Sequence, residues 1–426
     1  MNKIVLSALA ALTIGTVGAS ASDVKFYTDT NGQVFTTPAE GRTEVVSKET
    51  SVFANSSKLE FSGEHYLGYT YKSTSDLKQS DETAHGLTAP LGDKTGTSTG
   101  NFEMRRNYVQ AKAYVLDDPK SYFRVTLDAT LDANNYQEVV VKYAYLYLNE
   151  VLPYTGVEFG QAHRPWIDYE EHNAWFYRSI SKVLTEADET ANLSNSADLG
   201  VNFQTKTNYF TSEIGLFNGE GYHGKDGATS HNGITDKLGT GNSLEWRLTA
   251  AMLGNGKTHR NPIKDTYFDA SFWGQYNAKN STNLNADKQA SDYKIYGLHT
   301  VYNMPSLLLS AQYIKAENDN KDGGVVASTT SAYNKNGNGY SVNATYRLGA
   351  NYQYEILARA DGWTAKKDGF DDLSTNNYIY GAAWKQNKNF KWLLTGQTFK
   401  AKDHANYAGT VVQDWTAGML TAQVSW

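Results

Sequence analysis

The stretch FEMRRNYVQAKAYV, residues 102–115, decides the fold. Its residues alternate between apolar and polar with a period of two, as successive side chains do along a β-strand. The apolar face carries Val109, Ala111, Ala113 and Val115, and the opposite face carries Arg106, Tyr108, Gln110, Lys112 and Tyr114. The strand therefore separates an apolar environment from a wet, cationic one, and the rest of the chain must decide which of the two is outside.

The N-terminal stretch MNKIVLSALAALTIGTVGASA has a basic start, an apolar run and small residues before position 22. This order is typical of a secretory signal peptide with an A-x-A-type cleavage site. We predict cleavage after Ala21, so that residues 1–21 are removed and the mature chain leaves the cytoplasm. The alternative is an N-terminal membrane anchor.

The composition excludes several classes of protein. The chain has 39 basic and 45 acidic residues, and removal of Lys3 with the signal peptide leaves 38 against 45, a net charge of −7. A nucleic-acid-binding protein usually has a basic excess, so we expect no nucleic-acid partner. The absence of cysteine excludes thiolate metal sites and cysteine nucleophiles. The mean hydropathy is −0.55, and nothing after the signal peptide approaches the roughly 20 apolar residues of a membrane-spanning helix.

The aromatic composition suggests that the chain crosses a membrane with β-strands instead of helices. The chain contains 30 tyrosines, 9 tryptophans and 36 glycines, but only 7 prolines. Such a composition fits many strands, and it fits the aromatic girdles of a transmembrane barrel. A barrel strand needs about 9–11 residues with every second one apolar, so a hydrophilic chain can still cross a membrane.

Sixteen segments alternate in this way. They are residues 58–71, 102–116, 121–131, 137–148, 155–162, 197–205, 209–217, 243–253, 266–277, 292–302, 307–316, 339–348, 352–363, 377–386, 390–400 and 414–426. We therefore predict an all-β fold, a transmembrane antiparallel β-barrel of about 16 strands spanning residues 58–426. The alternative, a soluble sandwich, would also alternate.

The connections between these segments are short and long in turn. Short ones include residues 117–119, 303–306, 349–350 and 387–389, and long polar ones include 73–101, 163–196, 218–242, 278–291 and 317–338. Outer-membrane barrels have short periplasmic turns and long external loops, whereas a sandwich has no reason for this asymmetry. One connection, residues 254–265, is long where a short turn is expected.

The last strand ends in an aromatic residue. Leu420, Ala422, Val424 and Trp426 alternate up to the C-terminus. This pattern resembles the C-terminal strand through which bacterial outer-membrane proteins are recognised by the barrel-assembly machinery. The alternative is a strand that ends in Trp by chance.

If the apolar faces contact lipid, the polar faces line a water-filled interior. Arg105 and Arg106 are adjacent, so one would face lipid unless the pair lies at the external rim or on a β-bulge. The segment 139–148 is ambiguous, since both its faces are apolar apart from Lys142. The pore-lining residues that alternation predicts are Arg106, Lys112, Arg124, Asp128, Glu245, Arg247, Glu355 and Arg359, and Arg105 joins them if the arginine pair lies at the rim or on a bulge. Singly, each could be a solvated wall residue in a salt-linked network; together they shape the potential that an ion meets.

The long connection 163–196 is rich in aromatic and charged residues, which is unusual for a surface loop. We predict that it folds into the barrel and narrows the pore. Its candidate constriction residues are His163, Arg164, Asp168, Glu170, Glu171 and Arg178. The histidines and carboxylates could also be interpreted as a metal cluster, but their spacing matches no compact ligand motif such as H-E-x-x-H, and we expect no metal or other cofactor.

A family resemblance rests on the order of several short motifs. They are Met104-Arg105-Arg106, Phe123-Arg124-Val125, Ala144-Tyr145, Gly160-Gln161, Phe176-Tyr177-Arg178-Ser179 and Leu199-Gly200-Val201. Together with the terminal strand, this region resembles the phosphate-selective porin O and P family of Gram-negative bacteria. The resemblance implies a trimer of 16-stranded barrels whose third external loop enters the pore. It further implies that Arg105 and Arg106 line the constriction, with a basic residue near His163 and Arg164.

Two features depart from the family pattern. Tyr143 stands where the family tends to have an acidic residue, and residues 163–190 contain three basic against six acidic residues, a net charge of −3. Because a basic constriction attracts anions and an acidic one attracts cations, the sequence leaves the ion preference open.

Residues 22–57 precede the barrel. They contain VKFYTDTNGQVFTTP, in which Asn31-Gly32 lies between aromatic and β-branched residues, a pattern typical of a β-hairpin. We predict a small periplasmic hairpin or pore-entry segment; the alternative is a disordered leader.

The sequence as a whole predicts a trimeric porin of the bacterial outer membrane, embedded among lipid and lipopolysaccharide, that passes ions and small hydrophilic solutes passively. The main alternative is a surface adhesin or structural protein acting through its long loops. An enzyme is disfavoured because the chain has no P-loop.

Overall fold

The structure is a computed structural model. It describes residues 26–29, 34–35, 37–45, 59–76, 93, 95–114, 118–131, 137–187, 189–219, 221–222, 242–284, 290–318, 336–366, 372–402, 405–407 and 410–426. The predicted signal peptide and much of the predicted long connections lie outside the described residues. The chain divides into two compact units, Met1–Ser57 and Lys58–Trp426.

The first unit contains a three-stranded antiparallel sheet. In it β1 (Phe26–Thr28) lies between β2 (Val34–Phe35) and β3 (Thr43–Val45). The pairing of β1 with β2 is that of a hairpin across residues 29–33, although the Asn31-Gly32 turn itself lies outside the described residues.

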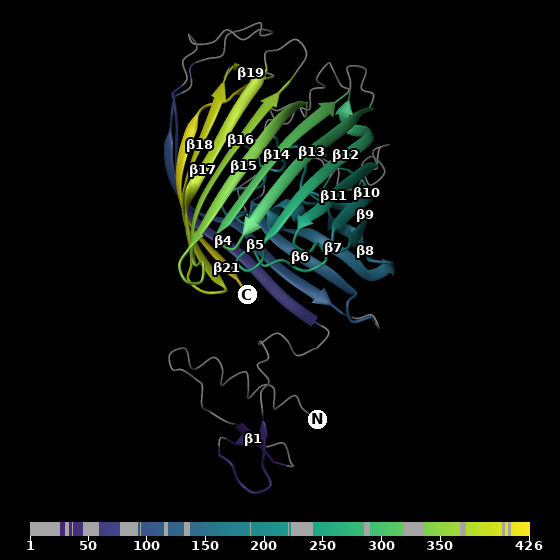
Figure 1. The fold of residues 1–426 in the computed structure, drawn as a ribbon. Coiled ribbons are helices and arrows are strands. Elements are labelled where there is room, and N and C mark those ends of the chain that lie inside the picture. The colour runs from purple at the N-terminus through teal and green to yellow at the C-terminus, as the bar shows by residue number, and fades with distance from the viewer. Residues whose placement is uncertain are drawn as a thin grey trace. The chain divides into compact units, whose positions relative to one another are not determined.

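The second unit is a closed barrel of sixteen antiparallel strands (Figure 1). The strands are β4 (Leu59–Thr74), β5 (Ser98–Ala113), β6 (Tyr122–Leu131), β7 (Gln137–Leu152), β8 (Thr155–His163), β9 (Ala197–Lys206), β10 (Phe210–Phe217), β11 (Ser243–Leu253), β12 (Tyr267–Leu284), β13 (Ala290–Met304), β14 (Leu307–Asn318), β15 (Gly337–Leu348), β16 (Tyr354–Ala365), β17 (Leu373–Lys385), β18 (Phe390–Lys402) and β21 (Trp415–Ser425). Each strand pairs with the next along the chain, and β21 closes the ring against β4. A further pair, β19 (Ala405–Tyr407) and β20 (Thr410–Val411), lies in the connection before β21.

The structure confirms the predicted fold class, and every one of the sixteen predicted segments is a barrel strand. The two-residue period explains why: each strand shows apolar side chains on the outside and mostly polar ones inside. Phe102 is 88% exposed and Val109 is 43% exposed, whereas Tyr108, on the other face, is buried. A ring of this kind has no free sheet edge, so every strand finds backbone partners.

The connections at one end of the barrel are short, and we call this the short-turn end. Residues 153–154 join β7 to β8, residues 305–306 join β13 to β14, and residues 349–353 join β15 to β16. Gly349 has φ +88° there, a conformation that favours glycine. The exception is the connection between β11 and β12, residues 254–266, which we call the long turn.

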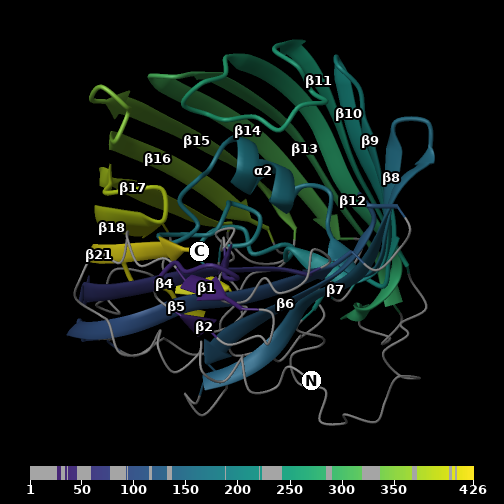
Figure 2. The same ribbon diagram turned by 90° about the horizontal axis from the view of Figure 1, so that it is seen from below.

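The chain between β8 and β9, residues 164–196, lies inside the ring of strands, and we call it the inner segment. Figure 2 shows its helix α2 (Ile167–Asn173) within the barrel. No helix among the residues placed by the structure is long and apolar enough to cross a membrane.

Candidate functional site in the barrel interior

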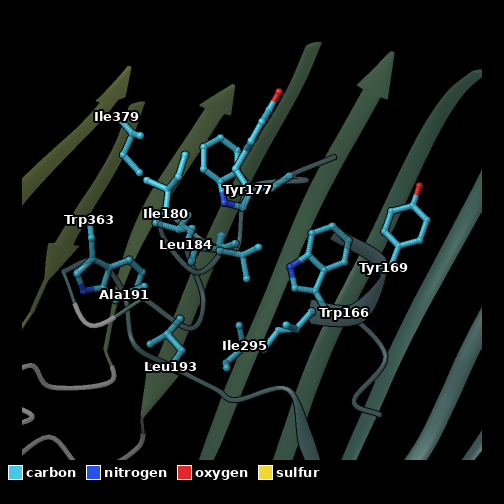
Figure 3. Close-up of a cluster of buried hydrophobic side chains, with 14 of the residues drawn as sticks. Trp166, Tyr169, Tyr177, Ile180, Leu184, Ala191, Leu193, Ile295, Trp363 and Ile379 are labelled. Atoms are coloured by element: carbon cyan, nitrogen blue, oxygen red, sulfur yellow. The ribbon is translucent and has the colours of Figure 1, made fainter. Parts of the chain in front are cut away.

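An apolar anchor holds the inner segment against one wall of the barrel. Trp166 stacks on Trp273 of β12 with ring centroids 4.6 Å apart and planes 6° from parallel. Figure 3 shows the wider cluster that this pair belongs to. From the inner segment it includes Trp166, Tyr169, Trp175, Tyr177, Ile180, Val183, Leu184, Ala191 and Leu193, and from the strands β12 to β18 it includes Trp273, Ile295, Ile314, Leu357, Trp363, Ile379 and Leu393. The interior is therefore not uniformly polar, because this wall is apolar where the inner segment covers it.

Polar contacts fasten the same segment at several further points. Arg164 donates to Glu245 of β11 at 2.8 Å, and Tyr177 donates to Glu355 of β16 at 3.1 Å. Arg359 of β16 donates to the carbonyl oxygen of Lys182 at 2.8 Å. These wall residues face the interior as alternation predicts, but they bond to the inner segment and do not border an open pore.

The opposite side of the interior holds a chamber of about 900 Å³. Most of its wall comes from strands β4 to β11, and the inner segment, the long turn, Asp269 of β12 and residues 423–426 at the C-terminus contribute the remainder. Charged residues lining it are Glu64, Arg124, Lys142, Glu158, Asp168, Glu171, Arg178, Lys206, Glu213, Arg247, Lys257, Arg260 and Asp269. Tyrosines 66, 108, 122, 143, 145 and 169 line it as well. The chamber is thus large, polar and mixed in charge.

A β-bulge turns both arginines of the opening stretch into the barrel. In the pairing of β4 with β5, Tyr66 is opposite Arg106 and Leu67 is opposite Met104, so Arg105 is an extra residue. Arg105 donates to the carbonyl oxygen of Ser179 in the inner segment at 2.9 Å. The bulge removes the conflict that strict alternation predicts for this pair, because it shifts the phase of the strand by one residue.

A second bulge places Lys142 inside. Thr126 of β6 is opposite Tyr143 of β7, whereas Leu127 is opposite Val141, which leaves Lys142 as the extra residue. Its side chain is buried, and its Nζ donates to the Tyr108 hydroxyl at 3.1 Å. This change of phase explains why both faces of residues 139–148 look apolar in the sequence.

Arg124 lies beside this lysine on the chamber wall. Its guanidinium donates to Tyr145 at 3.1 Å and lies 4.7 Å from the ring centroid of Tyr143. Its Nη1 is also 3.1 Å from Nε2 of His163. In the part of the chain that the structure describes, neither Arg124 nor Lys142 forms a salt bridge, so neither cation is paired with a carboxylate at contact distance.

Three acids of the inner segment, Glu170, Glu171 and Glu186, are in contrast neutralised. Arg178 pairs with Glu171 and with Glu186, the second at 2.7 Å. Burial alone would raise the pKa of Glu186, but the Arg178 guanidinium lowers that pKa well below its usual range, so Glu186 stays ionised as a partner of Arg178. Two of the carboxylates counted in the sequence therefore share one cation.

Glu170 loses its charge by a different route. It lies on α2, is 3% exposed, and accepts from Gln312 at 2.6 Å. Burial raises its pKa to about 8, which the attraction of Arg359 does not overcome. Glu170 is therefore mostly protonated at neutral pH, and the formal charge of −3 overstates the negative charge of the segment.

The predicted site residues divide into three groups. Arg124, Arg247, His163, Asp168, Glu171 and Arg178 line the chamber. Five others hold the inner segment to the wall: the wall residues Glu245, Glu355 and Arg359 bond to the segment, and Arg164 and Glu170 of the segment bond to the wall. Arg105, Arg106, Asp128 and Lys112 face inward elsewhere: Arg106 pairs with Asp128 at 2.9 Å, and Lys112 lies 3.9 Å from Glu60.

Two histidines and two carboxylates of β8 and α2 are linked in a row. His163 lies 2.9 Å from Glu158 through Nδ1 and 3.6 Å from Asp168 through Nε2, and His172 Nδ1 is 3.3 Å from Asp168. Within the described ranges, no group of three His, Asp or Glu side chains is placed to hold a metal ion.

Sequence reasoning missed Lys142, Glu186 and the long turn. Lys142 is hidden by its bulge, which a two-residue period cannot reveal. The partner of Glu186 lies eight residues earlier in an irregular segment, so no strand or helix period brings the two together. In the sequence, only the unusual length of the long turn indicated that it has a structural role.

The chain is similar to known proteins in structure but not detectably in sequence. No protein-family model matches the chain, and no curated protein matches its sequence. Among solved structures, an anion-selective porin from Comamonas acidovorans has a TM-score of 0.56 and 12% identity, over 86% of this chain and 99% of that one.

Two further structures have similar values. OprB of Pseudomonas putida has a TM-score of 0.54 and 10% identity, over 87% of this chain and 94% of that one. OmpT of Vibrio cholerae, in its trimer form, has a TM-score of 0.51 and 12% identity, over 86% of this chain and 99% of that one. At these identities the likeness is one of architecture, and this chain has the 16-stranded barrel fold of the bacterial porins.

Proposed function

We propose that the protein is an outer-membrane porin, a passive channel for ions and small hydrophilic solutes. The observation that carries the proposal is the chamber of about 900 Å³, lined by charged and tyrosine side chains, inside a closed barrel with an apolar outer face. In this orientation the short-turn end faces the periplasm and the outer face contacts lipid and, in the outer leaflet, lipopolysaccharide.

The inner segment is the element that limits passage. It packs against the apolar wall of β12–β18 and leaves a chamber that is lined mostly by β4–β11. A solute therefore travels past Arg124, Lys142 and Arg178 on one side and α2 on the other. No cofactor or chemical step is needed for this role.

Passage can be tested by liposome swelling. Purified protein, reconstituted in its folded form, should let small sugars enter and should exclude large oligosaccharides, because the inner segment narrows the barrel. Heat-denatured protein at the same amount is the control. Swelling no faster than that control with the smallest sugar would contradict the proposal.

We further propose that the channel prefers anions. The chamber wall carries Arg124 and Lys142, neither of which forms a salt bridge in the described residues. In the inner segment, Glu171 and Glu186 pair with Arg178, and Glu170 is protonated. The Comamonas acidovorans porin of similar fold is anion-selective. Phosphate, which the sequence resemblance suggests, is the first anion to compare with chloride. Phosphate at millimolar concentration should reduce the chloride current if it binds in the chamber, and sulfate serves as the matched control.

Two assembly properties complete the proposal. A homotrimer is supported by the trimer form of the V. cholerae barrel and by the sequence resemblance. Recognition by the assembly machinery is supported by β21, which ends the barrel next to β4 with Trp426 at its terminus. Crosslinking in outer-membrane fragments tests the first property, and truncation of Trp426, with yield of folded barrel as the readout, tests the second.

The adhesin alternative depends on the long external connections, most of which lie outside the described residues. The chamber favours the channel, because a protein acting only through its loops has no need of a polar interior.

A further inference from the structure

The long turn and the inner segment meet at one carboxylate. Asp269 of β12 is 1% exposed, and its Oδ2 accepts the hydroxyl of Tyr169 in α2 at 2.6 Å. Arg260 of the long turn pairs with the same carboxylate, its Nη2 lying 3.0 Å from Oδ1. One buried side chain of the barrel wall thus holds both elements.

A second contact of the same kind lies two residues away. Tyr267 of β12 donates its hydroxyl to the carbonyl oxygen of Asn173 at 2.8 Å, and the Arg260 guanidinium lies 4.5 Å from the centroid of its ring. Tyr169 and Asn173 are near the middle and at the end of α2, which spans Ile167–Asn173. Both of these hydrogen bonds between the helix and β12 therefore involve a side chain that Arg260 contacts.

The long turn has the internal bonds that a stiff element needs. Asp265 accepts the backbone N–H of Asn261 at 2.6 Å. Asn303 of β13 donates to the carbonyl oxygens of Pro262 and Asp265 at 3.0 and 2.7 Å. The backbone N–H of Gly256 bonds to Asn208 O at 2.8 Å, which ties the turn to the connection before β10. Arg260 consequently projects from a fixed support.

We propose that the long turn is a brace for the inner segment, with Arg260 as its positioning residue. A buried carboxylate is stable as an anion only when a cation and hydrogen-bond donors surround it. Arg260 supplies the cation through two parallel bonds, and the ionised Asp269 then fixes the Tyr169 hydroxyl and with it α2. The contact itself does not depend on the proposed channel function. Only its effect on conduction does, because α2 forms one side of the passage.

The contact can be tested without measuring transport. The chain has no cysteine, so His172→Cys provides a unique attachment point for a spin label on α2, at a side chain that is 67% exposed. The electron paramagnetic resonance line shape of the label reports the mobility of the helix. The test compares Arg260→Gln with Lys264→Gln, a matched change on the same turn at an exposed residue that does not line the chamber.

Arg260→Gln should mobilise the label, seen as narrowed lines, while Lys264→Gln leaves the spectrum unchanged. Arg260→Lys should give an intermediate spectrum, because a lysine restores the charge but not the two parallel bonds. An unchanged spectrum in Arg260→Gln, or an equal change in both glutamine variants, would overturn the proposal. If Arg260→Gln gives no folded barrel, Tyr267→Phe replaces it with the same expected mobilisation, and an unchanged spectrum there has the same consequence.

Conduction separates this inference from the proposed function. A wild type that conducts, with no label mobilisation in the variants, would refute the brace alone. A wild type that does not conduct, with clear mobilisation, would refute the channel and leave the brace in place.

Discussion

Arg105 and Arg106 are adjacent in β5, yet both side chains enter the barrel, because Arg105 is the extra residue of a β-bulge opposite Tyr66 and Leu67. The two arginines have different partners: Arg105 reaches the inner segment, and Arg106 pairs with Asp128, whose side chain is fully buried. The bulge thus produces one tether for the inner segment and one buried ion pair.

The Arg106–Asp128 pair predicts a non-additive effect on stability. Arg106→Ala leaves the Asp128 carboxylate without its cation, and breaking such a buried pair costs about 3–5 kcal/mol. Arg106→Gln combined with Asp128→Asn should cost much less, because no charge is left unpaired. Urea unfolding of the reconstituted barrel, followed by tryptophan fluorescence, measures both. A loss in the double variant equal to the sum of the losses in the two corresponding single variants would show that the pair is not energetically coupled.

Lys142 should contribute to anion preference more than Lys112 does. Lys142 lines the chamber without an ion-pair partner in the described chain, whereas Lys112 lies 3.9 Å from Glu60 and does not line the chamber. Lys142→Gln should lower the ratio of chloride to potassium permeability, and Lys112→Gln should leave it nearly unchanged. Zero-current potentials under a salt gradient give the ratio. A larger effect at Lys112 would place the ion path elsewhere.

Arg178 keeps two carboxylates from acting on the passing ion. Arg178→Gln leaves Glu171 and Glu186 without their cation, and the chamber becomes more negative. The channel should then shift toward cations, and adding Glu171→Gln and Glu186→Gln should restore the anion preference. The same zero-current potentials provide the measurement. A shift that persists in the triple variant would mean that Arg178 itself, and not the exposed carboxylates, sets the preference.

Glu170 predicts a pH dependence with a definite sign. Its pKa is raised from 4.5 to about 8 by burial, so the folded protein keeps a proton that the unfolded chain releases above pH 4.5. Stability therefore falls as the pH rises from about 4.5 through 8, and the anion preference falls as Glu170 ionises near pH 8. Glu170→Gln should remove this step from a titration of the permeability ratio. A step of unchanged size in that variant would assign the titration to another group.

The strands could be predicted from the sequence because a two-residue period is a local property. Residues 102–115 alone show it, and the alternation of short and long connections extends it to the whole barrel. The inward position of Arg105 and Arg106 also followed, once a bulge was allowed.

Other features depend on contacts that no local pattern contains. In residues 139–148 the phase changes at Lys142, and apolar residues on both sides of the bulge conceal the change. The inner segment packs on β12–β18 because these strands carry apolar residues on their inner face, such as Trp273 and Ile295. The pattern of one strand alone does not predict why an apolar residue faces inward. Asp269 bonds to Tyr169, which lies about a hundred residues away in the chain, and to Arg260 of the long turn. These contacts exist only in the folded barrel, so no local sequence pattern predicts them.

The central claim is that the barrel interior conducts ions past the cations of the chamber wall. The most direct test is the zero-current potential of purified protein in a planar bilayer under a tenfold KCl gradient. The account predicts discrete conductance steps and a zero-current potential with the sign expected for a chloride-selective channel. The magnitude of this potential should be smaller in the double variant Arg124→Gln/Lys142→Gln. Absence of conductance would contradict the channel, and a cation-selective potential that the double variant leaves unchanged would contradict the assignment of selectivity to that wall.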